Sequence, residues 1–135
     1  MKHIFIFLLL GLFLWTGCES EPKIPPLING VISFRDDFKL PADVVVSVRL
    51  LDLSNGEEKE MNKIQFQPNG QQIPLTFKIS YLEKDIQKNG KYVLDAEINF
   101  SVANLYYTLE PYEVLNNGVK NDVVMILVKG PKPKE

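Results

Sequence analysis

The sequence predicts an all-β fold, a single-domain antiparallel β-sandwich of about seven or eight short strands. Apolar and polar residues alternate with a period of two over most of residues 27–129, which is the pattern of half-buried strands. Turn-forming clusters of Pro, Asn and Gly separate these runs at intervals of about eight to fifteen residues, and little of the chain has a helical period. A partly open β-barrel is the alternative that the same pattern allows.

The first part of this domain is predicted to hold three strands. Residues 27–34 and 44–53 each place apolar side chains on one face, and Asn55-Gly56 after them suits a hairpin turn. Residues 57–67 are polar at first and apolar only late. Such charges discourage pairing between sheet edges, so we expect an edge strand there.

The middle of the domain continues the alternation after a turn at residues 68–70. Residues 73–81 form a clean strand pattern in which Pro74 lacks a backbone donor, so this strand lies at an edge or begins to pair after the proline. Residues 83–89 are expected to form one helical turn that ends at Gly90. A long strand over residues 92–102 follows, and Ala103-Asn104 is expected to turn the chain into residues 105–109.

The last part is predicted to contain a short extended piece at residues 112–115, a turn at residues 116–118 and one final strand. Residues 122–129 are apolar without alternation. Apolar side chains on both faces of a strand are typical of a central strand that is covered on both sides. We therefore expect the C-terminal strand in the middle of a sheet.

The N-terminal segment has the parts of an export signal: Lys2 and His3, an apolar run over residues 4–15, and then Thr16-Gly17-Cys18. The run is too short to span a bilayer, which needs about twenty apolar residues. The segment resembles a bacterial lipoprotein signal. That resemblance implies cleavage between Gly17 and Cys18, with an S-diacylglycerol and an N-palmitoyl group on Cys18.

These features predict four parts of the chain. Residues 1–17 form the cleaved signal peptide, and residues 18–26 form the lipidated cysteine and a proline-rich tether. Residues 27–129 form the sandwich domain, and residues 130–135 form a disordered tail. Eight extended tether residues reach about 25 Å, so the domain is expected to stay close to the membrane.

The composition of the mature chain disfavours an enzyme. His3 and Trp15 leave with the signal, and Cys18 is the only cysteine. Nucleophilic triads need an imidazole base, and zinc sites use mostly His and Cys, so we expect no catalytic residue, metal or cofactor. Loss of Lys2 leaves 14 basic and 17 acidic side chains, which argues against a nucleic acid partner.

Several ordered stretches are more specific than the strand pattern. They are Asn-Gly-Val-Ile-Ser-Phe-Arg at residues 29–35, Leu-Pro-Ala-Asp-Val-Val-Val-Ser-Val at 40–48, Gly-Gln-Gln-Ile-Pro-Leu-Thr-Phe-Lys-Ile-Ser-Tyr at 70–81, Ile86, and Gly-Lys-Tyr-Val-Leu-Asp-Ala-Glu-Ile at 90–98. Together these stretches resemble the YbaY/YscW lipoprotein family. The resemblance implies a compact β-sandwich held by lipid on the periplasmic face of the outer membrane. Its YscW branch serves type III secretion as a pilotin that helps a secretin ring to assemble. Its YbaY branch consists of stand-alone lipoproteins.

Three kinds of function remain open. A chaperone-like module that binds a partner, with a secretin as one candidate, would use aromatic anchors, and Tyr106, Tyr107 and Tyr112 are the candidates. Alternatively, Tyr107 packs with Leu105 and Leu109 while the other two tyrosines only cover sheet faces. A carrier of an apolar ligand such as a lipid would be lined by phenylalanines, which otherwise fill the core. The candidate lining residues are Phe34, Phe66, Phe77 and Phe100.

A hydrolase that uses two carboxylates is the third possibility. Asp36-Asp37 and Glu57-Glu58 are acid pairs, but neighbouring residues on a strand face opposite sides. Asp95 and Glu97 share a face, which we expect to be solvated, whereas an acid/base pair needs a cleft and two unequal environments. A solvated face is the better interpretation of these acids.

Overall fold

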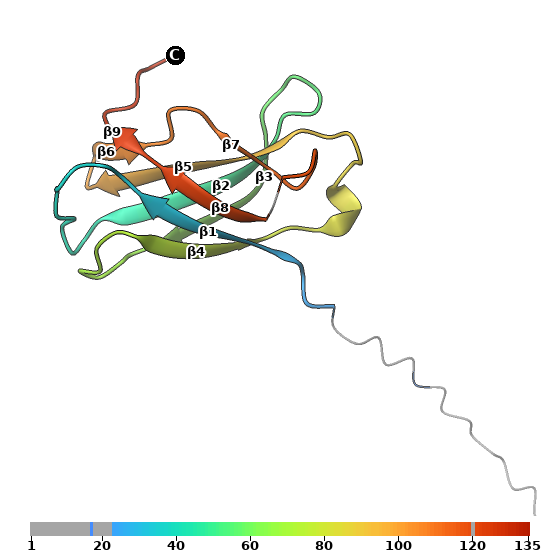
Figure 1. The fold of residues 1–135 in the computed structure, drawn as a ribbon, viewed down its shortest axis with the longest axis horizontal. Helices are drawn as coiled ribbons and strands as arrows, with labels where there is room; N and C mark the ends of the chain where they lie inside the picture. Colours follow the sequence, from blue (N-terminus) through green and yellow to red (C-terminus); the bar gives the residue numbers. More distant parts are fainter. Residues whose placement is uncertain (1–16, 18–22, 120) are drawn as a thin grey trace, which may run out of the picture.

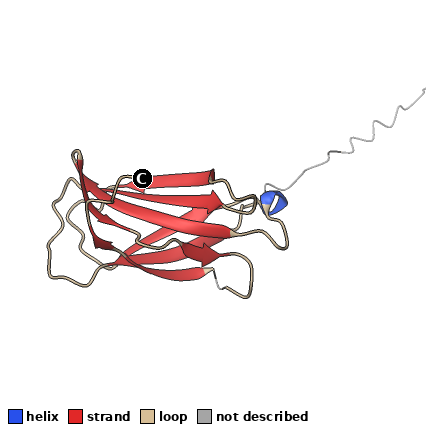
Figure 2. Ribbon diagram, turned by 90° about the horizontal axis from the view of Figure 1, so that it is seen from above, coloured by secondary structure: helices blue, strands red, loops and turns tan. Residues whose placement is uncertain are grey.

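The computed structural model describes residue 17, residues 23–119 and residues 121–135. Within these residues the chain forms two β-sheets that pack face to face, with one short 3-10 helix, η1, at Glu83–Asp85 (Figures 1 and 2). The two separate sheets confirm the predicted sandwich. Cys18 and nearly all of the predicted signal peptide lie outside the described residues.

The smaller sheet, sheet A, has three strands in the order β4-β1-β8. Strands β1 and β4 pair antiparallel, with Gly30 opposite Phe77, whereas β1 and β8 run parallel, with Gly30 opposite Val123. This parallel pair departs from the predicted antiparallel arrangement. The bounds of the strands are Leu27–Ser33 for β1, Leu75–Ser80 for β4 and Asp122–Ile126 for β8.

The larger sheet, sheet B, has the order β3-β2-β5-β6-β9, and β7 also pairs with β5. All of its strand pairs are antiparallel. The charged strand β3 lies at one edge, as predicted. The bounds are Val45–Asp52 for β2, Lys59–Phe66 for β3, Tyr92–Phe100 for β5, Ala103–Tyr107 for β6, Tyr112–Val114 for β7 and Val128–Lys129 for β9.

The core lies between the two sheets, where the predicted alternation places the apolar side chains. Because successive residues of a strand face opposite sides, every second residue of each central strand points inward. The phenyl ring of Phe77 covers Gly30, and a Cβ atom at Gly30 would overlap that ring. Fully buried residues of this core include Ile28, Ile32, Val46, Val48, Leu50, Leu75, Ile79, Leu94, Ile98 and Met125.

The prediction of one central strand at residues 122–129 is wrong. Strand β8 ends at Ile126 and lies at the edge of sheet A, where Val124 is 62% exposed. The chain then crosses to the other sheet through Leu127, which is buried and whose N–H donates to the Ser33 carbonyl over 2.9 Å. The first part of the apolar run therefore belongs to sheet A and the last part to sheet B. Because the run divides in this way, its continuous apolar sequence does not mark a strand that is covered on both sides.

Two smaller predictions are also corrected. Ala103 and Asn104 begin β6, and the turn before them is at residues 101–102, where Ser101 has a φ of 53°. The helical turn is shorter than predicted and spans only η1. The turns at residues 54–57 and 69–70 are confirmed, and β4 begins directly after Pro74 at an edge of its sheet.

Candidate functional site

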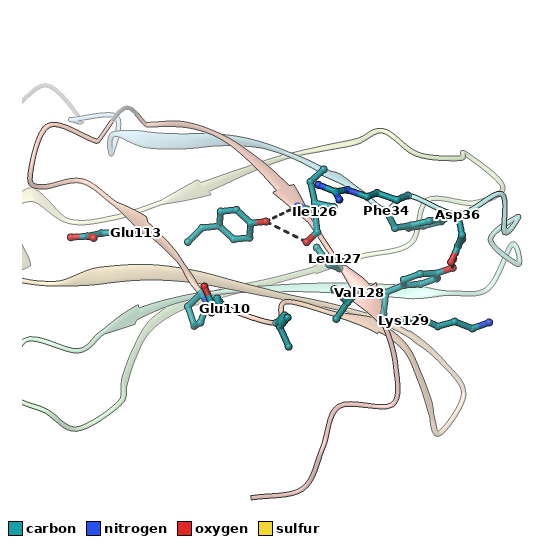
Figure 3. Close-up of a pocket in the computed structure, with 13 residues that line it drawn as sticks. Phe34, Asp36, Glu110, Glu113, Ile126, Leu127, Val128 and Lys129 are labelled. Atoms are coloured by element: carbon teal, nitrogen blue, oxygen red, sulfur yellow. Dashed lines mark hydrogen bonds between the residues drawn. The ribbon is translucent and has the colours of Figure 1, made fainter.

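A groove of about 770 Å³ lies at one edge of the sandwich, where residues of both sheets border it. One side of it is formed by the segment that leaves β8 and enters β9, and the other by the loop between β6 and β7 (Figure 3). The segment around Leu127, which moves the chain from sheet A to sheet B, borders this groove. We call this cavity the edge groove.

Two stacked aromatic rings form the floor at one end of the edge groove. Phe34, directly after β1, and Tyr106 of β6 have ring centroids 4.0 Å apart and an interplanar angle of 10°. Both side chains are buried. Phe34 comes from sheet A and Tyr106 from sheet B, so this pair joins the two layers beside the opening.

The Tyr106 hydroxyl is held by Asp36, which lies two residues beyond Phe34. It lies 2.7 Å from Oδ1 and 2.8 Å from Oδ2 of the Asp36 carboxylate and donates its hydrogen bond there. Burial raises the pKa of Tyr106, and the hydrogen bond to Asp36 and the negative charge of that carboxylate raise it further. The Tyr106 hydroxyl therefore stays protonated and holds the loop after β1 in place through the hydrogen bond that it donates to Asp36.

Tyr112 lines the edge groove, and its hydroxyl binds the backbone of Ile126, which Figure 3 labels. The Ile126 N–H donates to this hydroxyl over 2.9 Å, and the hydroxyl donates to the Ile126 carbonyl over 3.3 Å. The side chain of Tyr112 thus satisfies two backbone groups at the end of β8.

The rim of the edge groove carries an exposed apolar residue and charges of both signs. Leu109 is 64% exposed on the loop between β6 and β7, beside Pro111. Glu113 lies at one end of the groove, whereas Lys129 lies at the other end near Asp36 (Figure 3). An apolar floor with charged side chains of both signs on its rim fits a polypeptide segment better than a small anion or cation.

The structure brings two of the three predicted tyrosines together. Tyr106 and Tyr112 line the edge groove, whereas Tyr107 lies on the opposite face of sheet B, because neighbouring residues of β6 face opposite sides. Tyr107 is buried there, and Leu109 beside it remains largely exposed. Tyr106 is also buried, so its ring supports the groove from below.

Sequence reasoning missed the residues that border the opening. The sequence pattern indicates Asp36 only as one of an acid pair, and Leu109 only as a packing partner of Tyr107. A signal was present in Leu109-Glu110-Pro111, where a proline and a charge interrupt the strand pattern and leave an apolar residue without a strand to bury it. The switch of sheets at Leu127 had no such signal.

Phenylalanines do not gather around one cavity. Phe34 lines the edge groove, but Phe77 packs over Gly30 and Phe66 packs partly buried against the core. Phe100 is 38% exposed near the turn after β5. The predicted lining set for an apolar ligand is therefore not brought together.

The expectation that Asp95 and Glu97 share a solvated face is wrong for Asp95, which is only 5% exposed. Arg49 lies directly opposite Asp95 in the pairing of β2 with β5 and makes an ion pair with it. Arg49 also contacts Glu58 over 3.1 Å, and the Lys132 ammonium lies 3.9 Å from Asp95. In this cluster the buried Asp95 carboxylate is paired with cationic side chains, which is the arrangement of a structural ion pair.

The described part of the chain lacks two other kinds of feature. No group of three or more His, Cys, Asp or Glu residues there is arranged to hold a metal ion. Likewise, no helix of residues 23–119 or 121–135 is long and apolar enough to cross a membrane.

Comparisons with known proteins connect this geometry to envelope lipoproteins. The chain is 28% identical over 117 residues to the lipoprotein YbaY of Escherichia coli strain K12, an alignment that covers 84% of this chain. This chain spans 62% of the length of YbaY. Its fold matches the structure of an alternative pilotin from the type II secretion system of Vibrio cholerae, with a TM-score of 0.76 and 27% sequence identity. That match covers 81% of this chain and all of the pilotin chain.

The profile of the type III secretion system lipoprotein chaperone family, YscW, matches residues 25–127, which include both sheets and all but the last strand. The sequence motifs, the sandwich and this match agree. The chain belongs to the YscW family of lipoproteins.

Proposed function

We propose that this protein is a lipid-anchored, non-catalytic module that binds a segment of another envelope protein in the edge groove. The observation that carries the proposal is the groove itself, which combines an apolar floor, the exposed Leu109 and charges of both signs on its rim. Membership of a family of lipoprotein chaperones supports the same class of function. Such a module acts by holding its partner, and so it needs no catalytic pair.

The position of the tether suits this role. Its last residue, Pro26, accepts a hydrogen bond from the Tyr81 N–H over 3.2 Å, so the tether joins the domain where β1 begins. Phe34 follows the other end of β1, about 23 Å away for seven extended residues. A domain held by lipid on Cys18 would therefore present the Phe34 end of the edge groove away from the bilayer, toward the periplasm.

Lipid attachment gives the module its place of action. Two or more acyl chains on Cys18 would anchor the chain stably, where a single chain gives only marginal binding. Confinement to the outer membrane raises the local concentration of the module near partners in the same membrane. The fold match to a type II secretion pilotin favours a secretin as this partner.

The test replaces the native gene with variants of the exposed groove residue. Leu109→Glu places a charge on the apolar rim and should reduce the fraction of the secretin that assembles as an outer-membrane multimer and that co-purifies with the lipoprotein. Leu82→Glu is the matched control, because Leu82 is 50% exposed and lies outside the edge groove. If the two variants assemble the secretin equally well, the edge groove is not its binding site, and if deletion of the gene also has no effect, the secretin is not the partner.

A further inference from the structure

We propose that the free edge of β8 is a second binding element, which takes an extended segment of a partner as an added strand. This inference rests on the proposed function, because it assumes that the module binds envelope proteins. It concerns a different surface from the edge groove: the outward-facing backbone of Asp122 and Val124 beside the outer face of sheet A.

The pairing of β8 with β1 determines which backbone groups point outward. In a parallel ladder, alternate residues of one strand bond to the neighbouring strand. Asn121 accepts from the Asn29 N–H over 2.9 Å, and Leu127 donates to Ser33, so the odd-numbered residues of this stretch face β1. The N–H and carbonyl groups of Asp122, Val124 and Ile126 therefore face away from the sheet.

Among residues 23–119 and 121–135, only the Ile126 end of β8 has partners for its outward-facing groups. Tyr112 binds both outward groups of Ile126 through its hydroxyl. Within the described residues, no side chain or backbone group outside β1 bonds to the backbone of Val124. Its side chain is also 62% exposed. The Tyr112 hydroxyl thus takes the hydrogen-bonding position that one residue of an added strand would occupy beside Ile126. The corresponding position beside Val124 is open among the described residues.

Two other edge strands of the sandwich, β3 and β4, carry protection against pairing that is lacking at Val124. Strand β3 bears exposed charges and a register shift opposite Leu50 and Leu51. Strand β4 follows Pro74 and carries Lys78, and the Asn62 side chain donates to the Ser80 carbonyl at its end over 2.9 Å. Natural sheets protect edges by such devices, so an uncharged and open edge at Val124 indicates a surface that is used for pairing.

A second copy of this chain does not fit this edge. Antiparallel pairing of two identical strands requires a two-fold axis perpendicular to them, which would place the two tethers at opposite ends of the pair. Both copies are tethered to the same membrane surface in the proposed function. The occupant is therefore an extended segment of a different protein, bound by strand addition.

The surroundings of Val124 define the chemistry of that segment. The residue that pairs with Val124 would lie over a shallow depression on the outer face of sheet A, which includes Val31 and Thr76. Its neighbours would point inward, on the same side of the sheet as the buried Val123. Asp122 at the end of the strand favours a lysine or arginine beside it. The segment is accordingly apolar at alternate positions and cationic at one end.

The probe is a synthetic peptide of alternating valine, threonine and lysine, methylated on every second backbone nitrogen so that it can pair along one edge only. Addition of the peptide to the purified full chain should slow hydrogen exchange at the Val124 amide. The variant Val124→Pro removes an outward-facing N–H donor, so it should abolish peptide binding and the slower exchange at neighbouring amides. The variant Val124→Thr keeps the donor, so it should retain both peptide binding and the slower exchange. Asp122→Lys should weaken the binding, and Tyr112→Phe should extend the protection to Ile126.

Three outcomes would overturn the inference: unchanged exchange at Val124, equal binding by the proline and threonine variants, or protection that maps to β3 or β4. If Val124→Pro does not fold, Asp122→Lys and Tyr112→Phe decide the matter through the same exchange measurement. Leu109→Glu should bind the peptide normally. If the peptide protects the Val124 amide but neither Leu109→Glu nor deletion of the gene affects the secretin, the proposed function is refuted. The binding site at the β8 edge is then retained.

Discussion

Asp36 and Tyr106, which are 70 residues apart in sequence, form a hydrogen-bonded pair across the end of the sandwich. The tyrosine ring is buried under the edge groove, while the carboxylate lies on the exposed loop after β1. Because the same ring stacks on Phe34, one side chain connects the loop, sheet A and sheet B. The shape of this end of the edge groove therefore depends on Tyr106.

Removal of the Tyr106 hydroxyl should destabilise the domain moderately. Tyr106→Phe keeps the stacked ring and loses the hydrogen bond to Asp36, and the exposed carboxylate regains water, so we expect a loss of about 1–2 kcal/mol in the free energy of unfolding. Urea unfolding measures this change. Tyr81→Phe is the control, because the Tyr81 hydroxyl makes no hydrogen bond within the described residues, and an equal loss in both variants would contradict the assignment.

The same pair predicts a loss of stability at alkaline pH. Folding raises the pKa of Tyr106, because burial and the nearby Asp36 disfavour the phenolate. The unfolded chain therefore releases this proton first, and the stabilisation is complete below pH of about 10 and declines as the pH rises above that value. Unfolding measured between pH 8 and about 11.5 should show a steeper decline for the native protein than for Tyr106→Phe. Parallel curves would show that Tyr106 does not contribute.

Arg49 should be required for the stability of sheet B because it neutralises the buried Asp95. Arg49→Met leaves that carboxylate with only Lys132 at 3.9 Å, and we expect a loss of about 2–4 kcal/mol. The double variant Arg49→Met, Asp95→Leu should recover most of this loss, since no buried charge remains. A double-mutant cycle in urea without coupling between the two positions would rule out this explanation.

Gly30 should not tolerate a side chain while Phe77 is present. A methyl group at Gly30 would overlap the Phe77 ring on the paired strand, so Gly30→Ala is expected to cost about 1–3 kcal/mol through overpacking. A smaller partner makes room, and Gly30→Ala combined with Phe77→Leu should lose less stability than the sum of the two single changes. Strict additivity in thermal unfolding would contradict the contact.

Local patterns were sufficient to predict most of the strands. The alternation of residues 27–34 and 44–53 identifies their inward faces correctly, because a half-buried strand must place one face on the core. Pro74 and the charges of residues 57–67 likewise identify two sheet edges. These features act over a few residues, and so the sequence displays them directly.

The remaining features depend on which strands become neighbours. The apolar run at residues 122–129 is read as one strand until the pairing with β1 and β6 shows that it divides at Leu127. Asp95 is classed as solvated until its position opposite Arg49 is known. The Asp36–Tyr106 pair and the edge groove follow from the same long-range pairing, which no local period reveals.

The mass of the mature protein extracted from the cell envelope tests the central claim most directly, which is that the module works from a lipid anchor on Cys18. Intact mass spectrometry should find a chain that begins at Cys18 and carries the added mass of a diacylglycerol and a fatty acyl group. The Cys18→Ser variant should keep its leader and carry no lipid. A native chain that retains Met1, or one that begins at Cys18 without added lipid mass, would contradict the account.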